Sequence, residues 1–334
     1  MLRNLLKTLL ILVLFLAVLE GILRLVGFKP YDLPTFTFEV RPSPCFGNID
    51  LGVNLIPGKY DVAINKELKF TATHNNDSCR ITSFINKDSL PYIAVLGCSY
   101  SYGTGVSDEE TYPFMLNSKL ANYDIVNYSV LSYGTVQHYL QLQEIFLQED
   151  LSEIVIINYA DFHEERNLLS RRYQYKLYQG YKLVNNQKNT LYYPKLILLK
   201  DSFHVIQTDV LQQFKPFPFR NYLATANAIE LMLANWSSKK TDDSEGSKLL
   251  LKQMNELCLA HNTTLIVADI DYASDSEEIE KFCKNQNIAY VNISPNFEEN
   301  GFRNLPYDNH PNFAAHKCYA DKMFNYLEEN MLIQ

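Results

Sequence analysis

The sequence predicts an α/β fold, a flavodoxin-like three-layer sandwich built on a five-stranded parallel sheet. Two observations carry this prediction. Five short apolar runs have the length and the β-branched content of buried strands, and segments with helical periodicity separate them. The runs are Ile93–Leu96, Tyr123–Asn127, Glu153–Asn158, Thr264–Asp269 and Ala289–Asn292. One transmembrane helix is expected before this domain, at the N-terminus.

Residues 1–28 form that expected helix. The segment is almost continuously apolar between Leu5 and Val26, which is long enough to span a bilayer. Arg3 and Lys7 precede the apolar core, so we expect a cytoplasmic N-terminus and a main domain outside the cytoplasm, in the periplasm or at the cell surface. No small-x-small cleavage site follows, which favours a retained anchor over a cleaved signal peptide. A helix lying on the membrane surface is the runner-up, and the near-continuous leucine content argues against it.

Composition narrows the class of protein. The chain has 334 residues, 47% hydrophobic and 20% charged, which describes a folded protein. The formal net charge of −8 argues against a nucleic-acid partner, because such proteins normally present a basic face. The six cysteines include no Cys-x-x-Cys pair, which argues against a zinc ribbon or a thioredoxin motif.

Two regions flank or interrupt the predicted sheet. Residues 29–89 contain short alternating pieces between Pro, Gly and Asn turns, and we expect a β-rich lead-in packed on the main domain. Residues 168–245 interrupt the alternation of strands and helices. We expect this insertion to form a cap over the site, with a hairpin at 173–184, where apolar and polar residues alternate.

The first candidate functional segment follows the run Ile93–Leu96. Gly97, Cys98 and Ser99 come next, and glycines recur at 103 and 105. A buried strand that ends in a turn of small residues places a hydroxyl at the carboxyl edge of a sheet, where α/β folds bind ligands. The segment is not the Gly-x-Ser-x-Gly elbow of the α/β-hydrolases.

The second candidate segment lies before the last predicted helix, 312–329, and reads DNHPN from Asp308. Together the two segments resemble the SGNH (GDSL-type) hydrolases, in a membrane-anchored subtype with Gly-Cys-Ser in the first block. Cys98 replaces the family's usual Asp. The matching residues are Gly97, Ser99, Gly103, Gly105, Val106, Thr111 and Pro113 in the first block, and Asp308, His310, Pro311 and Asn312 in the last. The resemblance covers about residues 90–334 and implies the SGNH hydrolase fold for them.

The resemblance also implies roles. Ser99 is expected to be the nucleophile, His310 the base that takes its proton, and Asp308 the group that orients the imidazole. Neither a metal nor an organic cofactor is implied.

Two middle blocks of the family concern the oxyanion. The second block falls on residues 127–137, where Ser132 occupies the position of a family glycine. The backbone N–H groups of Ser99 and Ser132 are therefore expected to bind the oxyanion. The third block lacks the family's Asn, and His163 is expected to be a third donor in its place.

The expected activity is that of a serine esterase or O-acyltransferase. The substrate would be an acylated small molecule or glycan, and membrane-anchored relatives suggest O-acetyl esters of a cell-surface polysaccharide. Two alternatives stay open. One is an inactive glycan-binding or assembly protein on the same fold, which the departures at Cys98, Ser132 and the third block favour. The other is a thiol enzyme that uses Cys98.

Overall fold

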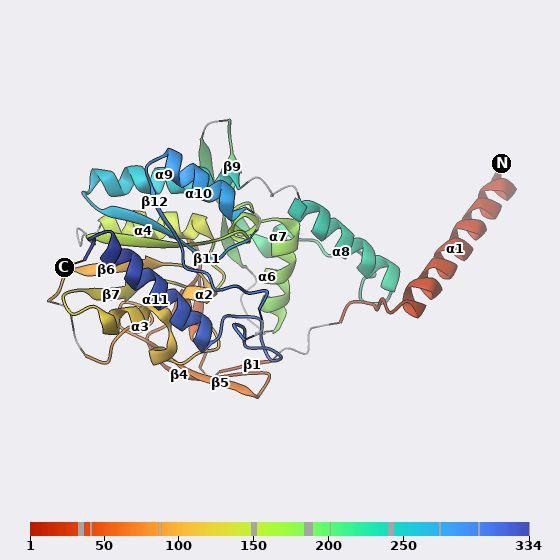
Figure 1. The fold of residues 1–334 in the computed structure, drawn as a ribbon. Helices are drawn as coiled ribbons and strands as arrows, with labels where there is room; N and C mark the ends of the chain where they lie inside the picture. Colours follow the sequence, from red (N-terminus) through yellow and green to blue (C-terminus); the bar gives the residue numbers. More distant parts are fainter. Residues whose placement is uncertain are drawn as a thin grey trace. The chain divides into compact units, whose positions relative to one another are not determined.

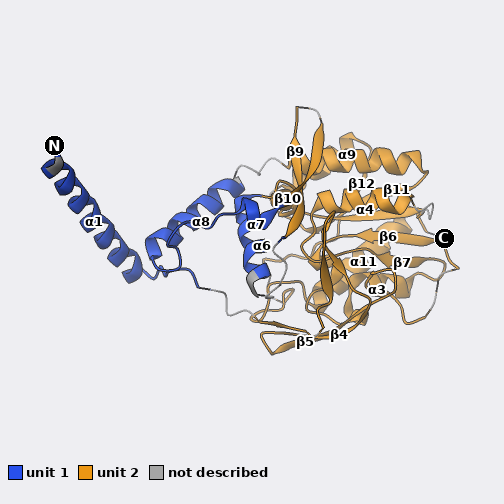
Figure 2. Ribbon diagram, turned by 180° about the vertical axis from the view of Figure 1, so that it is seen from behind, with its two compact units in different colours: residues 1–35, 170–190, 209–241 blue, residues 36–169, 191–208, 242–334 orange. Residues whose placement is uncertain are grey.

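A computed structural model describes residues 1–32, 37–40, 42–85, 87, 89–147, 152–183, 190–200, 202–239, 244–273, 275–299 and 301–333. The chain divides into two compact units (Figure 2). The sheet unit comprises residues 36–169, 191–208 and 242–334, and the helical unit comprises residues 1–35, 170–190 and 209–241. From residue 36 on, the predicted lead-in therefore shares a unit with most of the predicted main domain, whereas residues 29–35 and parts of the predicted insertion belong to the helical unit.

Five parallel strands form the centre of the sheet unit, in the order β12-β11-β8-β6-β7. This order is that of flavodoxin-like sheets and confirms the predicted fold class. The chain passes from β6 to β7 on one side and then to β8 on the other, so the switch point lies beside β6. The strands are β6 Tyr92–Leu96, β7 Asp124–Asn127, β8 Ile154–Ala160, β11 Thr264–Asp271 and β12 Ala289–Asn292.

Helices cover both faces of this sheet (Figure 1). Ile93 and Val95 of β6 pack in one core with α3 (Tyr112–Lys119) and α11 (Phe313–Glu329). Ala94 and Leu96 point to the opposite face and pack in a second core. That second core includes residues of α4 Thr135–Leu147, α9 Glu245–Ala260 and α10 Ser276–Asn285. The alternation of side chains along a strand thus fills two apolar layers.

Smaller sheets complete the unit. In the lead-in, β1, β4 and β5 form a three-stranded antiparallel sheet, and β2 pairs with β3. Further along the chain, β9 pairs with β10. Their bounds are β1 Phe38–Glu39, β2 Cys45–Asn48, β3 Gly52–Leu55, β4 Gly58–Ile64, β5 Leu68–His74, β9 Tyr192–Leu198 and β10 Phe203–Asp209.

The helical unit contains α1 Leu2–Leu25, α6 Arg171–Leu183, α7 Val210–Gln213 and α8 Ala224–Lys239. The hairpin predicted at 173–184 is wrong, because the described part of this segment belongs to α6. Its tyrosines at 175, 178 and 181 recur every three residues, which suits a helix face, and two of them pack on Phe214. The prediction that residues 168–245 cap the site stays a prediction.

Helix α1 is long and apolar enough to cross a membrane, with a mean hydropathy of 2.4 over Arg3–Leu25 and none of its most apolar stretch buried. This agrees with the expected membrane anchor. By length and composition alone, a signal sequence would pass the same test.

Candidate active site

The predicted nucleophile lies in a tight turn after β6. Ser99 begins the short helix α2, Ser99–Tyr102, which Cys98 precedes in an extended conformation. Only glycine fits at position 97, since a Cβ there would lie 2.3 Å from the Oγ atom of Ser101. The turn therefore places Ser99 at the carboxyl end of a central strand, beside the switch point of the sheet.

The structure brings the three predicted catalytic side chains together. The Nδ1 atom of His310 lies 2.6 Å from Oδ2 of Asp308, and its Nε2 atom lies 3.0 Å from Oγ of Ser99. Burial raises the pKa of Asp308, but hydrogen bonds from His310 and from the Asn309 and His310 N–H groups outweigh it and lower the pKa overall. Because the ionised carboxylate can only accept, Nδ1 carries the proton and Nε2 is left to accept from the Ser99 hydroxyl.

A second contact holds the loop that carries His310. The backbone N–H of Asn304 donates to the carbonyl of His310 over 3.0 Å, and its side-chain amide donates to Pro311 over 3.1 Å. Gly105 makes room for that amide: it has φ +90°, and a Cβ there would lie 2.6 Å from Nδ2 of Asn304. The glycine loop after the nucleophile and the histidine loop therefore fit against each other only without a side chain at 105.

Arg303 is a residue near the site that sequence reasoning missed. Its Nη1 atom donates to Oη of Tyr100 over 3.0 Å and to the carbonyl of Asn309 over 2.9 Å. Its Nη2 atom lies 3.5 Å from Oδ1 of Asp271, the last residue of β11. The guanidinium of Arg303 therefore links the turn after Ser99, the loop that carries His310 and the end of strand β11. The only signal in the sequence was an arginine seven residues before His310.

Aromatic rings pack around the catalytic imidazole. The ring of Tyr100 makes edge contacts with His310 at 5.7 Å and with Phe162 at 5.4 Å, and it lies 6.3 Å from Phe297. Burial raises the pKa of Tyr100 to about 12, so the phenol is neutral and keeps its proton near neutral pH. The catalytic imidazole therefore has an aromatic ring packed against it, and that ring is itself held between two phenylalanines.

The two predicted oxyanion donors beyond Ser99 lie in distinct settings. Ser132 has φ +67°, the left-handed region that its family glycine would favour and that costs a side-chain-bearing residue about 1–2 kcal/mol. His163 is 0% exposed and makes edge contacts with His138, Tyr159 and Phe162. Neither ring nitrogen of His163 has a hydrogen-bond partner among the described residues. Its oxyanion role stays a prediction.

The alternative thiol nucleophile is poorly placed. Cys98 is 0% exposed and belongs to the core between the sheet and helices α3 and α11. A thiolate must be reachable to attack a substrate, so this setting suits a structural cysteine. All six cysteines, each among the described residues, are free.

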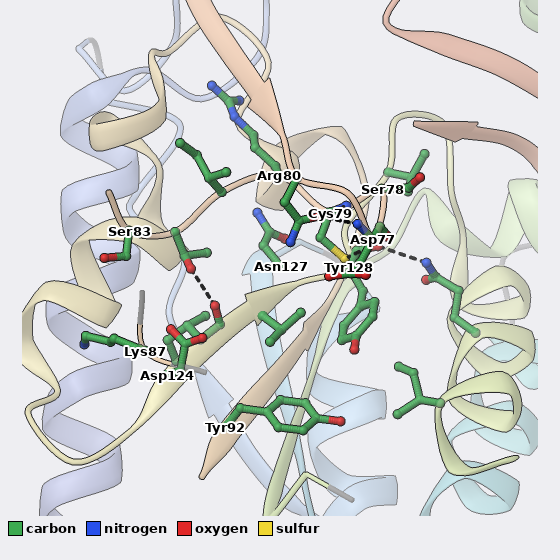
Figure 3. A pocket seen from close by; sticks show the side chains of 18 of the residues that line it. Asp77, Ser78, Cys79, Arg80, Ser83, Lys87, Tyr92, Asp124, Asn127 and Tyr128 are labelled. Carbon is green, nitrogen blue, oxygen red and sulfur yellow. Dashed lines mark hydrogen bonds between the residues drawn. The ribbon is translucent and has the colours of Figure 1, made fainter. Parts of the chain in front are cut away.

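A separate pocket of about 900 Å³ lies beside the edge strand β7 (Figure 3). Its lining comes from the segment around 75–92, from β7 and from α4, and includes Tyr92, Asp124 and Asn127. None of its described lining residues is Ser99, Asp308 or His310. The proposed chemistry therefore draws on the contacts around Ser99 and not on this pocket.

The half-buried Asp161 and the buried Asp269, at the same edge of the sheet, make the stability of the protein depend on pH. Burial raises the pKa of Asp161, which follows β8, to about 7, although the N–H of Asp275 opposes the shift. Burial likewise raises the pKa of Asp269 in β11 to about 6. Both values lie above the usual value for Asp of about 3.9, so between about pH 4 and pH 7 the folded state binds protons that the unfolded state has lost. The contribution of these two carboxyls to stability therefore falls as the pH rises through this window. The buried His138, His163 and His316 act in the opposite direction, because burial lowers their pKa and only the unfolded state protonates them below about pH 6.5.

We expect Asp161→Asn to raise the Tm relative to the unmodified chain by more at about pH 8 than at about pH 5.5, measured by thermal unfolding of the full chain. The substitution removes the titration of Asp161 and leaves the other titrating groups in place, so the difference between the two chains isolates this carboxyl. Asp321→Asn is the matched control, because lysine hydrogen bonds lower the pKa of Asp321 and it does not titrate in this range. An Asp161→Asn profile as steep as that of the unmodified chain would contradict the assignment.

Comparison with known proteins places these observations in context. No family model matches the chain, and no curated protein matches it. Among solved structures, it is similar to a member of the lipolytic protein G-D-S-L family from Veillonella parvula, at 10% identity and TM-score 0.39 over 71% of this chain and 98% of the other. It is also similar to an acetyl xylan esterase from Geobacillus stearothermophilus, at 10% identity and TM-score 0.40 over 72% and 94%.

A third similar structure is an extracellular lipase from Streptomyces rimosus, at 10% identity and TM-score 0.38 over 70% of this chain and 99% of the other. The proteins that this chain is similar to thus include the family that its motifs resemble. Similarity at these identities and TM-scores carries no argument about activity or substrate, which must come from the site itself.

Proposed function

We propose that this chain is a serine esterase or O-acyltransferase. The observation that carries the proposal is the continuous relay of hydrogen bonds from Asp308 through His310 to Ser99, at 2.6 and 3.0 Å. A hydroxyl, an imidazole and an ionised carboxylate in this order are the components of nucleophilic acyl transfer. Their position at the carboxyl end of β6 is where ligands bind in open α/β sheets.

In the proposed reaction, Oγ of Ser99 attacks the acyl carbonyl while Nε2 of His310 takes the hydroxyl proton. The tetrahedral intermediate then collapses, the ester C–O bond breaks, and the imidazolium gives that proton to the departing alcohol. Water, or a sugar hydroxyl in a transferase, attacks the acyl-enzyme; His310 takes the proton of the incoming O–H and returns it to Ser99. Asp308 stays ionised and stabilises the imidazolium.

The oxyanion would be bound by backbone N–H groups. The first N–H groups of a helix have no partner within it, so the N–H of Ser99 at the start of α2 can donate to a developing negative charge. The N–H of Ser132 is the proposed second donor, and a neutral His163 the third. Losing one such donor typically costs about 3 kcal/mol in the transition state.

The proposed substrate is an O-acyl ester, in particular an O-acetyl ester of a cell-surface glycan, and no nucleic acid or cofactor takes part. This choice rests on the motif resemblance to membrane-anchored relatives. A substrate at the cell surface requires the sheet unit to lie outside the cytoplasm. We therefore propose that α1 anchors the chain with its N-terminus in the cytoplasm. The supporting feature is the pair Arg3 and Lys7 before the apolar core.

The experiment that tests the proposal is active-site labelling of the full chain in detergent with a fluorophosphonate, read by intact mass. We expect one adduct on the unmodified chain and none on Ser99→Ala or His310→Ala. Ser101→Ala is the matched control: this serine lies two residues further along the same turn, is 0% exposed and should leave labelling intact.

A folded chain that takes no adduct would overturn the proposal. The glycan-binding or assembly role would then be the better one. The strained Ser132 and the fully buried His163 are the observations that favour it.

A further inference from the structure

The last turns of α1 are built into the helical unit. The side chain of Glu20 accepts hydrogen bonds from the backbone N–H groups of Ala224 and Thr225, both at 2.8 Å, and from the Thr225 hydroxyl at 2.7 Å. Arg24 pairs with Glu20 at 2.7 Å and donates to the carbonyl of Tyr222 at 3.0 Å. Glu20 therefore caps the N-terminus of α8, and removal of α1 by signal cleavage would leave those N–H groups without this partner.

The stretch that α1 holds in this way presents apolar side chains and no charge. From Phe219 to Ser238, every residue of which the structure describes, there are two charged side chains, and both are buried. Arg220 packs over the ring of Tyr31 at 4.1 Å, and Glu230 pairs with Arg171 at 3.0 Å. The large exposed side chains are Phe219, Tyr222, Leu223, Leu231, Met232, Leu233 and Trp236. We call this surface the α8 face.

The α8 face begins at the end of the apolar helix. A helix that spans a bilayer leaves the hydrocarbon near its last apolar turns, and those turns, at Glu20 and Arg24, hold the start of α8. Segments that lie at the boundary between lipid headgroups and acyl chains typically expose Trp, Tyr and Phe beside an uncharged helix surface, as this stretch does.

The two units also differ in charge, and the difference agrees with a membrane contact of the helical unit. Without Arg3 and Lys7, which precede the apolar core and lie on the other side of the bilayer in the proposed topology, the helical unit contains eleven Lys and Arg against four Asp and Glu, whereas the sheet unit contains seventeen against thirty-four. A basic unit is attracted to anionic headgroups, and an acidic one is repelled by them. The sign of the charge thus separates a unit suited to a membrane surface from one suited to water.

We propose that the α8 face lies in the interfacial layer of the bilayer that α1 enters. The helical unit is then a membrane-seated module with one spanning helix and one surface helix. This inference is independent of the chemistry proposed at Ser99. It requires that α1 is retained in the mature chain, in keeping with the hydrogen bonds that Glu20 makes.

Trp236 provides the test, because it is the single tryptophan of the chain and lies on the α8 face. The full chain is reconstituted into vesicles of phosphatidylcholine and phosphatidylglycerol, and flotation selects the inserted protein. We expect blue-shifted emission, shielding from aqueous acrylamide, which is neutral and is not repelled by anionic lipid, and about twofold quenching by phospholipids brominated near the headgroup end of their chains, as for an interfacial tryptophan. Lipids brominated near the terminal methyl should quench less.

Two results would overturn the proposal. Full quenching by acrylamide with no effect of brominated lipid would place the α8 face in water. Shielding from acrylamide with no effect of brominated lipid would mean that protein covers it.

A variant makes the assignment specific. Met232→Glu puts a charge one helical turn from Trp236 and should increase quenching by the neutral quencher acrylamide. Leu259→Glu makes the same kind of change at a residue of α9 that is 66% exposed, and it should leave the signal of Trp236 unchanged. Equal quenching of Trp236 in the two variants would count against contact between the α8 face and the bilayer.

Discussion

Replacing Ser99 by alanine is expected to lower kcat/KM for an aryl acetate by about 10⁴-fold to 10⁶-fold, because the reaction loses its nucleophile. His310→Ala should cost nearly as much, since the hydroxyl 3.0 Å from Nε2 then has no base. The measurement is steady-state hydrolysis by the full chain in detergent, with each variant checked for folding by circular dichroism.

The double variant separates a catalytic relay from two independent contributions. If Ser99 and His310 act as one unit, the double variant has about the same residual rate as either single variant, as residues of a triad do. Additive losses, or a Ser99→Ala chain with undiminished turnover, would contradict the proposed roles. Ser101→Ala should stay close to the rate of the unmodified chain.

The sheet and the ends of its strands could be predicted because their signals are local. An apolar run such as Ile93–Leu96, closed by a glycine, has one stable environment, which is a strand buried on both faces. The same locality placed Ser99 after one strand and Asp308 and His310 before the last helix. Their meeting then follows from topology, because the carboxyl ends of parallel strands share one edge.

The parts that could not be predicted depend on contacts far apart in sequence. Segment 173–183 alternates over a few residues like a strand, but as a helix two of its tyrosines pack on Phe214, which follows α7. At the start of the same helix, Arg171 pairs with Glu230 of α8. Arg303 is an ordinary loop arginine until folding brings Tyr100 and Asp271 to its side chain. The burial of His163 likewise comes from the packing of helices, which no local pattern fixes.

Arg80 likewise depends on contacts with residues far away in the sequence, and its replacement is expected to cause a large loss of stability. This residue of the lead-in is 1% exposed and pairs with Asp108 at 3.0 Å. Its remaining guanidinium N–H groups donate to backbone carbonyls of Thr71, Tyr102, Gly103 and Val106 at 2.7 to 3.0 Å. Three of these four carbonyls belong to the glycine loop after the nucleophile. One buried cation therefore holds the conformation of the loop on which Ser99 depends.

Arg80→Met is expected to destabilise the folded sheet unit by about 3–5 kcal/mol, because it leaves a buried carboxylate and several carbonyls without their donor. For a unit of this size the Tm should fall by roughly 10 °C, measured by circular dichroism on the full chain. Lys281→Met is the matched control, since that side chain is 74% exposed. Adding Asp108→Asn removes the unpaired charge and should recover part of the loss. A Tm no lower than that of Lys281→Met would show that the glycine loop is held by other contacts.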